Sequence, residues 1–373
     1  MKICLFADAQ SVHIQQLVPG LLARGLEVHV LTHKPAELPG ATVERFCVPP
    51  ASLANPRRWN GRRAAYLRRF LRRFDVVNIH FLSDWGFELL DGSPDDLEVF
   101  HDGCVIVTAW GSDVSDPPGE TPASTDLIRK RVAMLRSAAA VTTCGPTFAE
   151  IVARYGGIER ENVHVVPFGV NTELFRPSDH QRRGPDHIPR VGFYKGFREV
   201  YGAEYLIRAI PGVLAEIPEA RFELIGDGPC LESCQTLARR LGVESSVDWL
   251  GRQRHDALGR ILDRWDVSVI PSIHEAFGVA ALESSAAAVP VVASNVEGLR
   301  DTVVDGETGL LVEPKNPDAL TDAIVSLLGD DEKCVGMGRA GRAMVERAYD
   351  WRDVHTQWVR LYERVLETSA VMV

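Results

Sequence analysis

The chain has 373 residues, of which 45% are hydrophobic and 25% charged. This length exceeds the size at which a single hydrophobic core stops growing, so it predicts two domains of ordinary size. The formal net charge of −10 argues against nucleic acid as the main partner, and no apolar run approaches the roughly 20 residues that span a bilayer.

The first residues and the cysteines both favour a reducing compartment. The apolar run of "MKICLFADAQ" breaks at Asp8, which is too early for the core of a signal peptide. The seven cysteines are an odd number, and no CxxC or Cys/His cluster has metal-ligand spacing. We therefore expect a cytoplasmic protein with free thiols and no metal site.

Short β-rich runs alternate with helical or loop segments along the chain, which is the pattern of strand, helix and strand units in a parallel sheet. The first series begins with "KICLFA" and "EVHVLTH" and ends with "AVTTCG" and "NVHVVPFG". A second series follows residue 189, from "RVGFY" to "TGLLVE". Two such series predict an α/β fold of two doubly wound domains.

The segment between the two series is rich in Pro, charge and His, and it lacks periodicity, which indicates a linker at 176–189. The first domain would then cover 1–175 and the second 190–350. Apolar residues in the last segment, 351–373, are spaced as one helical face that needs a partner surface. These residues are Trp351, Val354, Trp358, Leu361, Tyr362 and Val365.

An arginine-rich stretch at 57–73 predicts an amphipathic helix with a basic face. This face could rest on anionic lipid, as a peripheral membrane contact, and would suit a lipid-linked acceptor. Alternatively, the apolar side of the helix covers the sheet and its basic face is solvated or paired with the acidic 84–126 region. We favour the second interpretation. The apolar face would consist of Tyr66, Leu67, Phe70, Leu71 and Phe74.

Two glutamates, Glu275 and Glu283, flank the small residues of "HEAFGVAALES". The preceding residues predict a buried strand, and "VAALESSAAA" predicts a helix that can pack close to a sheet. Gly278 at the junction leaves the first helical amides open, and such amides bind phosphate. Both acids could face one ligand, although an isolated glutamate is more often a surface acid or favours a helix start.

Other predicted strands of the second domain also end in loops with glycine or charge, where open parallel sheets bind ligands. Lys195 and Arg198 follow its first strand, and either could neutralise a diphosphate. The loops after the next two strands carry Gly226, Asp227, Gly228, Gly251 and Arg252.

The second domain resembles the donor-nucleotide domain of retaining glycosyltransferases of the GT-B fold, in glycosyltransferase family 4. The motifs "HEAFGVAALE", "LIGDGP", "ASNVEGLRD" and "DGETGLLVEP" occur in that family's order and spacing. The first domain resembles the family through "LLARGLEVHVLT", "TAWGSDV" and "VVPFGVNTELFRP". The resemblance implies two Rossmann-like domains and a C-terminal helix, 351–373, that packs back on the first domain.

The resemblance also implies roles in the donor site. Glu275 would hydrogen-bond the donor sugar, and Glu283 would hold the ribose hydroxyls. Lys195 and Arg198 would stabilise the charge that develops on the diphosphate. The amides near Phe277, Gly278 and Val279 would receive that diphosphate.

The acceptor site departs most from the family. Trp110 stands where the family often has a histidine before the Gly of its HG-x-D motif, which ends here in Asp113. Ser11 and His13 replace a Gly-Gly loop. His13 could contact ligand or act as a structural hydrogen-bonder, and His80 could face either the cleft or the core.

The expected reaction is transfer of a sugar from a UDP- or GDP-sugar to an acceptor hydroxyl with retention, as in glycan, glycolipid or polysaccharide biosynthesis. The acceptor would be a sugar, a lipid-linked or a small molecule. No cofactor or metal is expected, because no D-x-D triplet is present. A sugar-nucleotide epimerase of the same architecture and a non-catalytic sugar-nucleotide binding protein are the alternatives.

Overall fold

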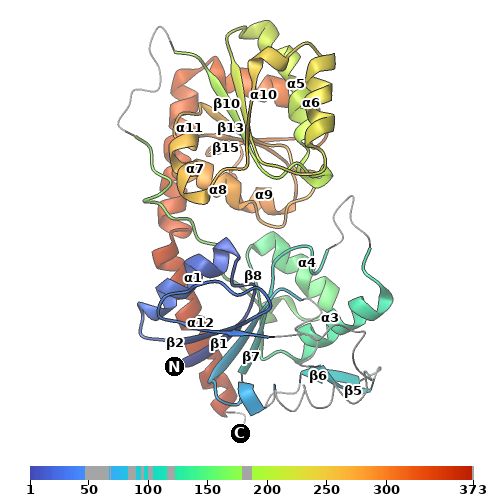
Figure 1. The fold of residues 1–373 in the computed structure, drawn as a ribbon, viewed down its shortest axis with the longest axis vertical. Coiled ribbons are helices and arrows are strands. Elements are labelled where there is room, and N and C mark those ends of the chain that lie inside the picture. Colours follow the sequence, from blue (N-terminus) through green and yellow to red (C-terminus); the bar gives the residue numbers. More distant parts are fainter. Residues whose placement is uncertain are drawn as a thin grey trace. The chain divides into compact units, whose positions relative to one another are not determined.

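The computed structural model describes residues 1–46, 67, 69–82, 90–93, 96–99, 104–115, 122–178 and 187–371. Its described residues form two compact units. One comprises the first part of the chain to Phe168 together with the last segment from Trp351, and the other comprises Gly169–Asp350. Each unit is built on its own parallel sheet (Figure 1).

The sheet of the first unit has the order β3-β2-β1-β4-β7-β8-β9, and all of its strand pairs are parallel. A hairpin, β5 (Leu90–Ser93) with β6 (Asp96–Val99), lies outside this sheet. The strands of the sheet are β1 (Lys2–Phe6), β2 (Glu27–Thr32), β3 (Thr42–Arg45), β4 (Val76–His80), β7 (Cys104–Ala109), β8 (Ala140–Thr143) and β9 (Val163–Val165).

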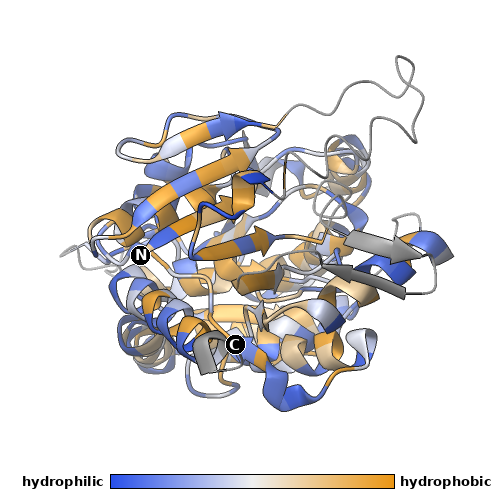
Figure 2. Ribbon diagram, turned by 90° about the horizontal axis from the view of Figure 1, so that it is seen from below, coloured by the Kyte–Doolittle hydropathy of each residue, from blue (hydrophilic) through white to orange (hydrophobic). Residues whose placement is uncertain are grey.

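Helices cover the first sheet because its central strands are buried and largely apolar (Figure 2). Local signals set their ends: Ser124 accepts from the Leu127 amide at the start of α3, and Gly157 ends α4 in the left-handed region. The helices are α1 (Val12–Leu22), α3 (Thr125–Ser137), α4 (Pro146–Gly156) and α12 (Trp351–Val371).

The apolar face predicted in the last segment packs in the core of the first unit, against residues such as Ile3, Leu5 and Ile14. A buried hydrogen bond from Asn78 Nδ2 to the Tyr362 hydroxyl, 3.1 Å long, also joins α12 to strand β4. The prediction that the C-terminal helix packs on the first domain is therefore confirmed.

The second sheet is also wholly parallel, with the order β12-β11-β10-β13-β14-β15. Its strands are β10 (Arg190–Tyr194), β11 (Arg221–Ile225), β12 (Val247–Gly251), β13 (Val267–Ile270), β14 (Val291–Ser294) and β15 (Gly309–Val312). Its helices are α5 (Ala203–Glu216), α6 (Leu231–Arg240), α7 (His255–Leu262), α8 (Val279–Ala286), α9 (Glu297–Thr302), α10 (Pro317–Leu328) and α11 (Asp331–Ala348).

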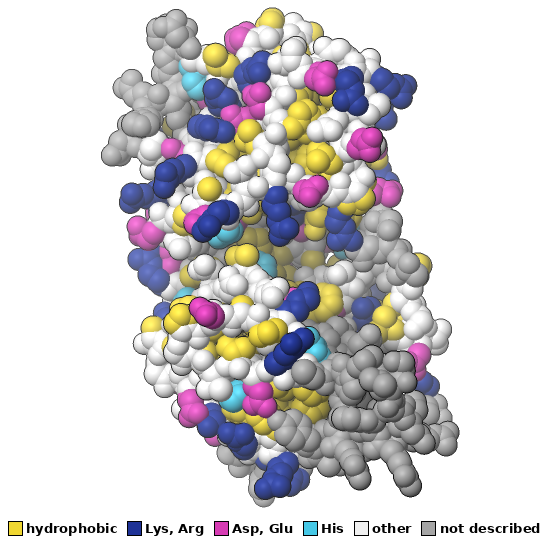
Figure 3. Space-filling view, in the orientation of Figure 1, with side chains coloured by type: hydrophobic (Ala, Val, Ile, Leu, Met, Phe, Trp, Pro, Cys, Tyr) yellow, Lys and Arg dark blue, Asp and Glu magenta, His cyan; other side chains and the backbone are white. Residues whose placement is uncertain are grey.

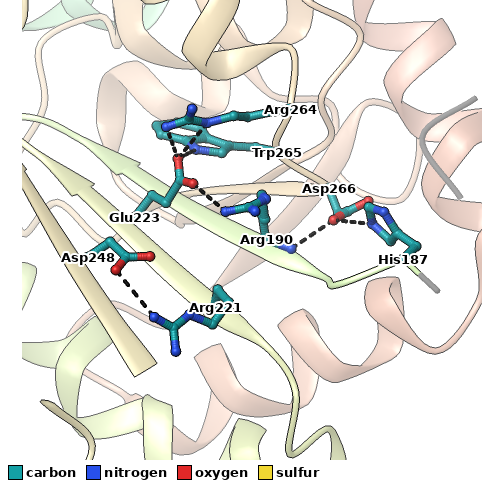
Figure 4. Close-up of polar contacts among 8 residues, drawn as sticks. All are labelled: His187, Arg190, Arg221, Glu223, Asp248, Arg264, Trp265 and Asp266. Carbon is teal, nitrogen blue, oxygen red and sulfur yellow. Dashed lines mark hydrogen bonds and ion pairs between the residues drawn. The ribbon is translucent and has the colours of Figure 1, made fainter. Parts of the chain in front are cut away.

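The amino-terminal end of the second sheet holds a buried polar cluster (Figure 4). Glu223, in the middle of β11, accepts hydrogen bonds from Arg190, Arg264 and the indole of Trp265. Nearby, Asp266 pairs with His187. Open parallel sheets bind ligands at the carboxyl ends of their strands. A cluster at the amino-terminal end therefore stabilises the fold of the unit and lies away from the expected ligand site.

The compact units divide after Phe168, whereas the linker composition places the boundary at 176–189. The reason is that the described ends of that segment are bound within the second unit. The Ser178 amide donates to Asp263, and the His187 ring pairs with Asp266. Upstream, the Val170 amide donates to the Tyr349 carbonyl at 2.7 Å. Residues 169–178 therefore belong to the second unit.

The predicted basic helix at 57–73 lies partly outside the described residues. Within its described part, Leu67, Phe70 and Leu71 are buried, and so is Phe74 just beyond it, whereas Arg69 and Arg73 are exposed. This arrangement agrees with a core-facing helix.

On the visible face of the second unit, basic and acidic side chains are interspersed (Figure 3). No described helix is long and apolar enough to cross a membrane.

Candidate functional site

A lysine and a glutamate form an ion pair at the carboxyl end of the second sheet. Lys195 follows β10 and Glu275 lies in the loop after β13, and Lys195 Nζ is 2.5 Å from Glu275 Oε2. The Lys195 ammonium also lies over the ring of Tyr201, 4.5 Å from its centroid. Adjacent central strands, β10 and β13, thus bring together two of the predicted catalytic residues.

The ion pair is mostly buried, with 14% and 13% of the two side chains exposed. Burial is the largest single influence on Lys195 and opposes its charge. Glu275, Tyr201 and Glu283 together outweigh burial and raise the pKa of the Lys195 ammonium. The Ser272 hydroxyl donates to the same carboxylate oxygen at 3.3 Å. The site therefore holds a fixed cation at neutral pH. By contrast, the side chain of Arg198 is exposed.

The second predicted glutamate lies inside α8, where its side chain is buried among small residues. Glu283 is 6% exposed, and its neighbours Ala280, Ser284 and Ala286 are buried as well. Two groups hold its carboxylate: His255 Nε2 lies 3.0 Å from Glu283 Oε1, and Tyr194 makes a hydrogen bond to Glu283. Burial raises the pKa of the Tyr194 phenol, and Glu283 adds to the rise.

The amino terminus of α8 carries no side-chain cap, since Gly278 occupies the N-cap position with a φ of 93°. A Cβ at Gly278 would lie 2.7 Å from Leu299 Cδ2. The turn of Phe277 and Gly278 is also packed against α9, because a Cβ at Gly298 would lie 2.2 Å from the Phe277 nitrogen. Only glycine fits at either position. Because glycine has no side chain, the first backbone amides of α8, which begins at Val279, have no side-chain cap.

The glycines after β11 shape the loop that carries Lys195. Gly226 and Gly228 have φ values of 141° and 153°. A Cβ at Gly226 would lie 2.0 Å from the Lys195 carbonyl, and one at Gly228 would lie 2.5 Å from the Phe197 carbonyl. The backbones of both glycines therefore pack directly against the loop that carries Lys195. Their role in the site is to set the shape of that loop.

Neighbouring residues of the predicted donor set occupy loop surfaces. Asp227 is exposed and accepts from the Gly228 amide at 2.7 Å. Gly251 accepts from the Gly226 amide at 3.0 Å, and Arg252, which follows it, is exposed. Gly251 therefore links the loops after β11 and β12.

The first unit contains an aromatic-lined cavity at the carboxyl ends of its strands. Its volume is about 20 Å³, which is room for about one water molecule. His13 stacks on Phe168 with ring centroids 4.0 Å apart, and Trp110 meets His13 edge to face. The cavity is also lined by His80, Trp351 and Trp358.

Unpartnered polar atoms border this cavity. His80 is 2% exposed, and burial lowers the pKa of its imidazole to about 3, with a smaller contribution from His13. Neither ring nitrogen of His80 has a hydrogen-bond partner among the described residues, and the same is true of Trp110 Nε1. A neutral hydroxyl could satisfy such groups.

Two residues predicted for this region do not line the cavity. Asp113 is fully buried, and its carboxylate accepts from the backbone amides of Leu82, Trp110 and Gly111. Burial raises the pKa of Asp113, and these amides oppose the rise. Through these bonds Asp113 fixes the turn after β7. Ser11 is the N-cap residue of α1 and is partly exposed.

Three residues that contact the predicted donor-site residues were not predicted from the sequence. His255 and Tyr194 hold Glu283, and Tyr201 lies against Lys195. His255 follows β12 by a few residues, and Tyr194 directly precedes Lys195. Their position at or just after the carboxyl end of a strand was the available signal. Among the described residues, no group of three or more His, Cys, Asp or Glu side chains could hold a metal ion.

Comparisons with known proteins bear on the family and the fold. Residues 176–344 match the family described as "Glycosyl transferases group 1", and residues 10–174 match "Glycosyltransferase Family 4". The D-inositol 3-phosphate glycosyltransferase of Corynebacterium aurimucosum is 32% identical over 54% of this chain and 51% of that protein. The match thus spans about half the length of that relative.

Two solved structures share the fold over almost the whole chain. Sucrose-phosphate synthase of Thermosynechococcus elongatus is 23% identical, with a TM-score of 0.81 over 99% of this chain and 100% of that one. HepE of Anabaena, crystallised with UDP and glucose, is 18% identical, with a TM-score of 0.78 over 98% and 100%. The two family matches together cover most of the chain, which therefore belongs to the group 1 glycosyltransferases of family 4, with the GT-B fold.

Proposed function

We propose that the protein transfers a sugar from a nucleoside diphosphate sugar to an acceptor hydroxyl, with retention of anomeric configuration and without a metal ion. The observation that carries the proposal is the fixed Lys195–Glu275 pair beside the uncapped start of α8, with Glu283 inside the same helix. HepE, a structural neighbour, was crystallised with UDP and glucose. A UDP-sugar is therefore the first donor to test, and a GDP-sugar is the second.

The donor's diphosphate would lie at the amino terminus of α8. The helix amides and the Lys195 ammonium supply positive charge where negative charge grows as the bond from the sugar to phosphate breaks. Lys195 can do this while paired, because an ammonium group has three donors and Glu275 engages one side of it. Arg198 is the second candidate for contact with the diphosphate as it leaves.

Glu275 has two tasks in this proposal. Its carboxylate holds Lys195 in place, and its remaining acceptor capacity hydrogen-bonds the donor sugar. Glu283 accepts from the ribose hydroxyls. In the transfer step the bond between the anomeric carbon and the leaving phosphate oxygen breaks, and the acceptor oxygen bonds to the same face of that carbon. The acceptor proton moves to the leaving phosphate, so that no protein nucleophile is required.

The acceptor would use the first unit, where the cavity at His13, His80 and Trp110 offers aromatic faces. The ring nitrogens of His80 and the indole nitrogen of Trp110 have no hydrogen-bond partner among the described residues. The cavity is lined by no Lys, Arg, Asp or Glu among the described residues. An uncharged hydroxyl-bearing group fits this lining better than a phosphate does. Sugar, lipid-linked and small-molecule acceptors all carry such groups.

The test is a transfer assay with the purified chain, a panel of UDP- and GDP-sugars and simple sugar or lipid acceptors, run with and without a chelator. We expect acceptor-dependent release of nucleoside diphosphate, an unchanged rate with chelator, and the same anomeric configuration in donor and product by NMR. Conversion of the donor sugar without any acceptor would instead identify an epimerase. Donor binding without turnover on any acceptor would favour a binding protein.

A further inference from the structure

A histidine on the neighbouring helix holds the carboxylate of Glu283. His255 is the first residue of α7, and Arg254 before it is the N-cap residue with extended backbone. The His255 ring contacts Phe175 edge to face, with centroids 5.4 Å apart, while its Nε2 lies 3.0 Å from Glu283 Oε1. The segment after β12 thus places the His255 imidazole in contact with the Glu283 carboxylate of α8.

Glu283 needs such a partner because a buried carboxylate is unfavourable unless it is paired and hydrogen-bonded. Its neighbours on α8 are small residues that are themselves buried. His255 engages one oxygen, Oε1, and Tyr194 supplies a second hydrogen bond from β10. Two donors on separate elements thereby restrict the carboxylate to one orientation.

We infer that His255 is a positioning residue for the donor nucleotide: it orients the Glu283 carboxylate toward the ribose hydroxyls and, when protonated, adds a positive charge to the donor site. The inference rests on the proposed function and extends it, because it makes donor affinity depend on the protonation of a side chain that does not touch the reacting atoms.

The sign of the pH effect follows from the groups that face His255. Its hydrogen bond to Glu283 raises the pKa of the imidazole above 6.5, burial opposes the rise, and Asp256 on its own helix adds to it. Asp256 is exposed and pairs with Arg254, while Tyr194 reaches only the Glu283 side. An anionic donor favours the imidazolium, so donor affinity is highest below this raised pKa and falls as pH rises through it.

A second histidine of the same unit provides a matched control. His187 pairs with Asp266 at 2.8 Å, so it too lies on a buried acid, but it stands before β10 at the amino-terminal end of the sheet (Figure 4). His187→Gln removes a histidine–carboxylate pair away from the proposed donor site. It therefore measures how the loss of such a pair affects the stability of the domain alone. It should leave donor affinity and its pH dependence unchanged.

The experiment titrates UDP-glucose and GDP-mannose into the wild type, His255→Gln, His255→Ala and His187→Gln by calorimetry, at several values between about pH 6 and about pH 9. Sugar nucleotides are used because their phosphates do not change ionisation in this range. Gln keeps a hydrogen-bond donor without charge, whereas Ala removes both. Thermal melts of each variant report on folding.

We expect His255→Ala to weaken the better donor about tenfold at low pH, the equivalent of one charge-assisted hydrogen bond. His255→Gln should lose less affinity and should lose the pH dependence. In a transfer assay the donor KM should rise while kcat changes less than about threefold. Equal affinity and pH dependence in all folded variants would overturn the inference. If neither donor bound the wild type, the proposed function itself would fall, and with it this role.

Discussion

Replacing Lys195 by Gln tests the ion pair that carries the proposed chemistry. The change removes the ammonium that lies 2.5 Å from Glu275 and 4.5 Å from the centroid of the Tyr201 ring, and it keeps a polar side chain of similar length. Two effects should follow, one on stability and one on rate. A second variant, Glu275→Gln, and the double variant separate them.

The effect on stability comes from leaving one charge unpaired in a mostly buried position. Removing one partner of such a pair costs about 2 to 3 kcal/mol of unfolding free energy, which includes about 0.5 to 1 kcal/mol for the lost cation–π contact. The double variant leaves no unpaired charge, so it should recover part of this loss. Urea unfolding of the three variants measures the coupling between Lys195 and Glu275.

The effect on rate comes from losing a preorganised charge near the leaving phosphate. Removal of one such donor typically lowers the rate on the order of 100-fold or more. The double variant should remain as slow as Lys195→Gln, because restored stability does not restore the charge. If folded Lys195→Gln kept kcat/KM within about threefold of the wild type, the proposed role of this lysine would be wrong.

Three further predictions follow. Glu223→Gln should lower the unfolding free energy by about 3 kcal/mol in urea, since Glu223 is buried and accepts from the buried Trp265 indole, from Arg190 and from the more exposed Arg264. By contrast, Asp248→Asn at the more exposed pair nearby should cost under about 1 kcal/mol. Gly298→Ala should weaken donor binding at least about tenfold in calorimetry, because its Cβ would lie 2.2 Å from the Phe277 nitrogen; unchanged affinity would contradict the packed turn. His80→Phe should raise the acceptor KM but not the donor Kd, and the reverse outcome would remove the cavity from the acceptor site.

The sequence predicted the fold because each domain repeats one local pattern. Apolar runs marked the strands, and the small residues around Glu283 marked a helix that packs tightly on a sheet. Gly278 and the two glutamates could be placed after β13 from their spacing alone. The sequence also left two candidate cations, and the structure places Lys195 against Glu275. That choice depends on the path of the long loop after β10.

Other features depend on contacts between distant segments, which spacing does not reveal. His255 contacts Glu283 although 28 residues separate them in the chain, and its position after β12 does not reveal which acid it contacts. Asp113 could be identified as part of a motif, but only the folded turn shows its carboxylate bound to three backbone amides. Likewise, the polar composition of 176–189 did not reveal that its ends are anchored on Asp263 and Asp266.

Direct titration of nucleotides into the purified chain tests the central claim, which is that the start of α8 and Lys195 bind the diphosphate of a sugar nucleotide. We expect saturable one-to-one binding of UDP or GDP that weakens at least about tenfold when Lys195 is replaced by Gln. Uridine and guanosine, which lack the diphosphate, should bind much more weakly. Equal binding of nucleoside and nucleoside diphosphate, or no binding of either, would contradict it.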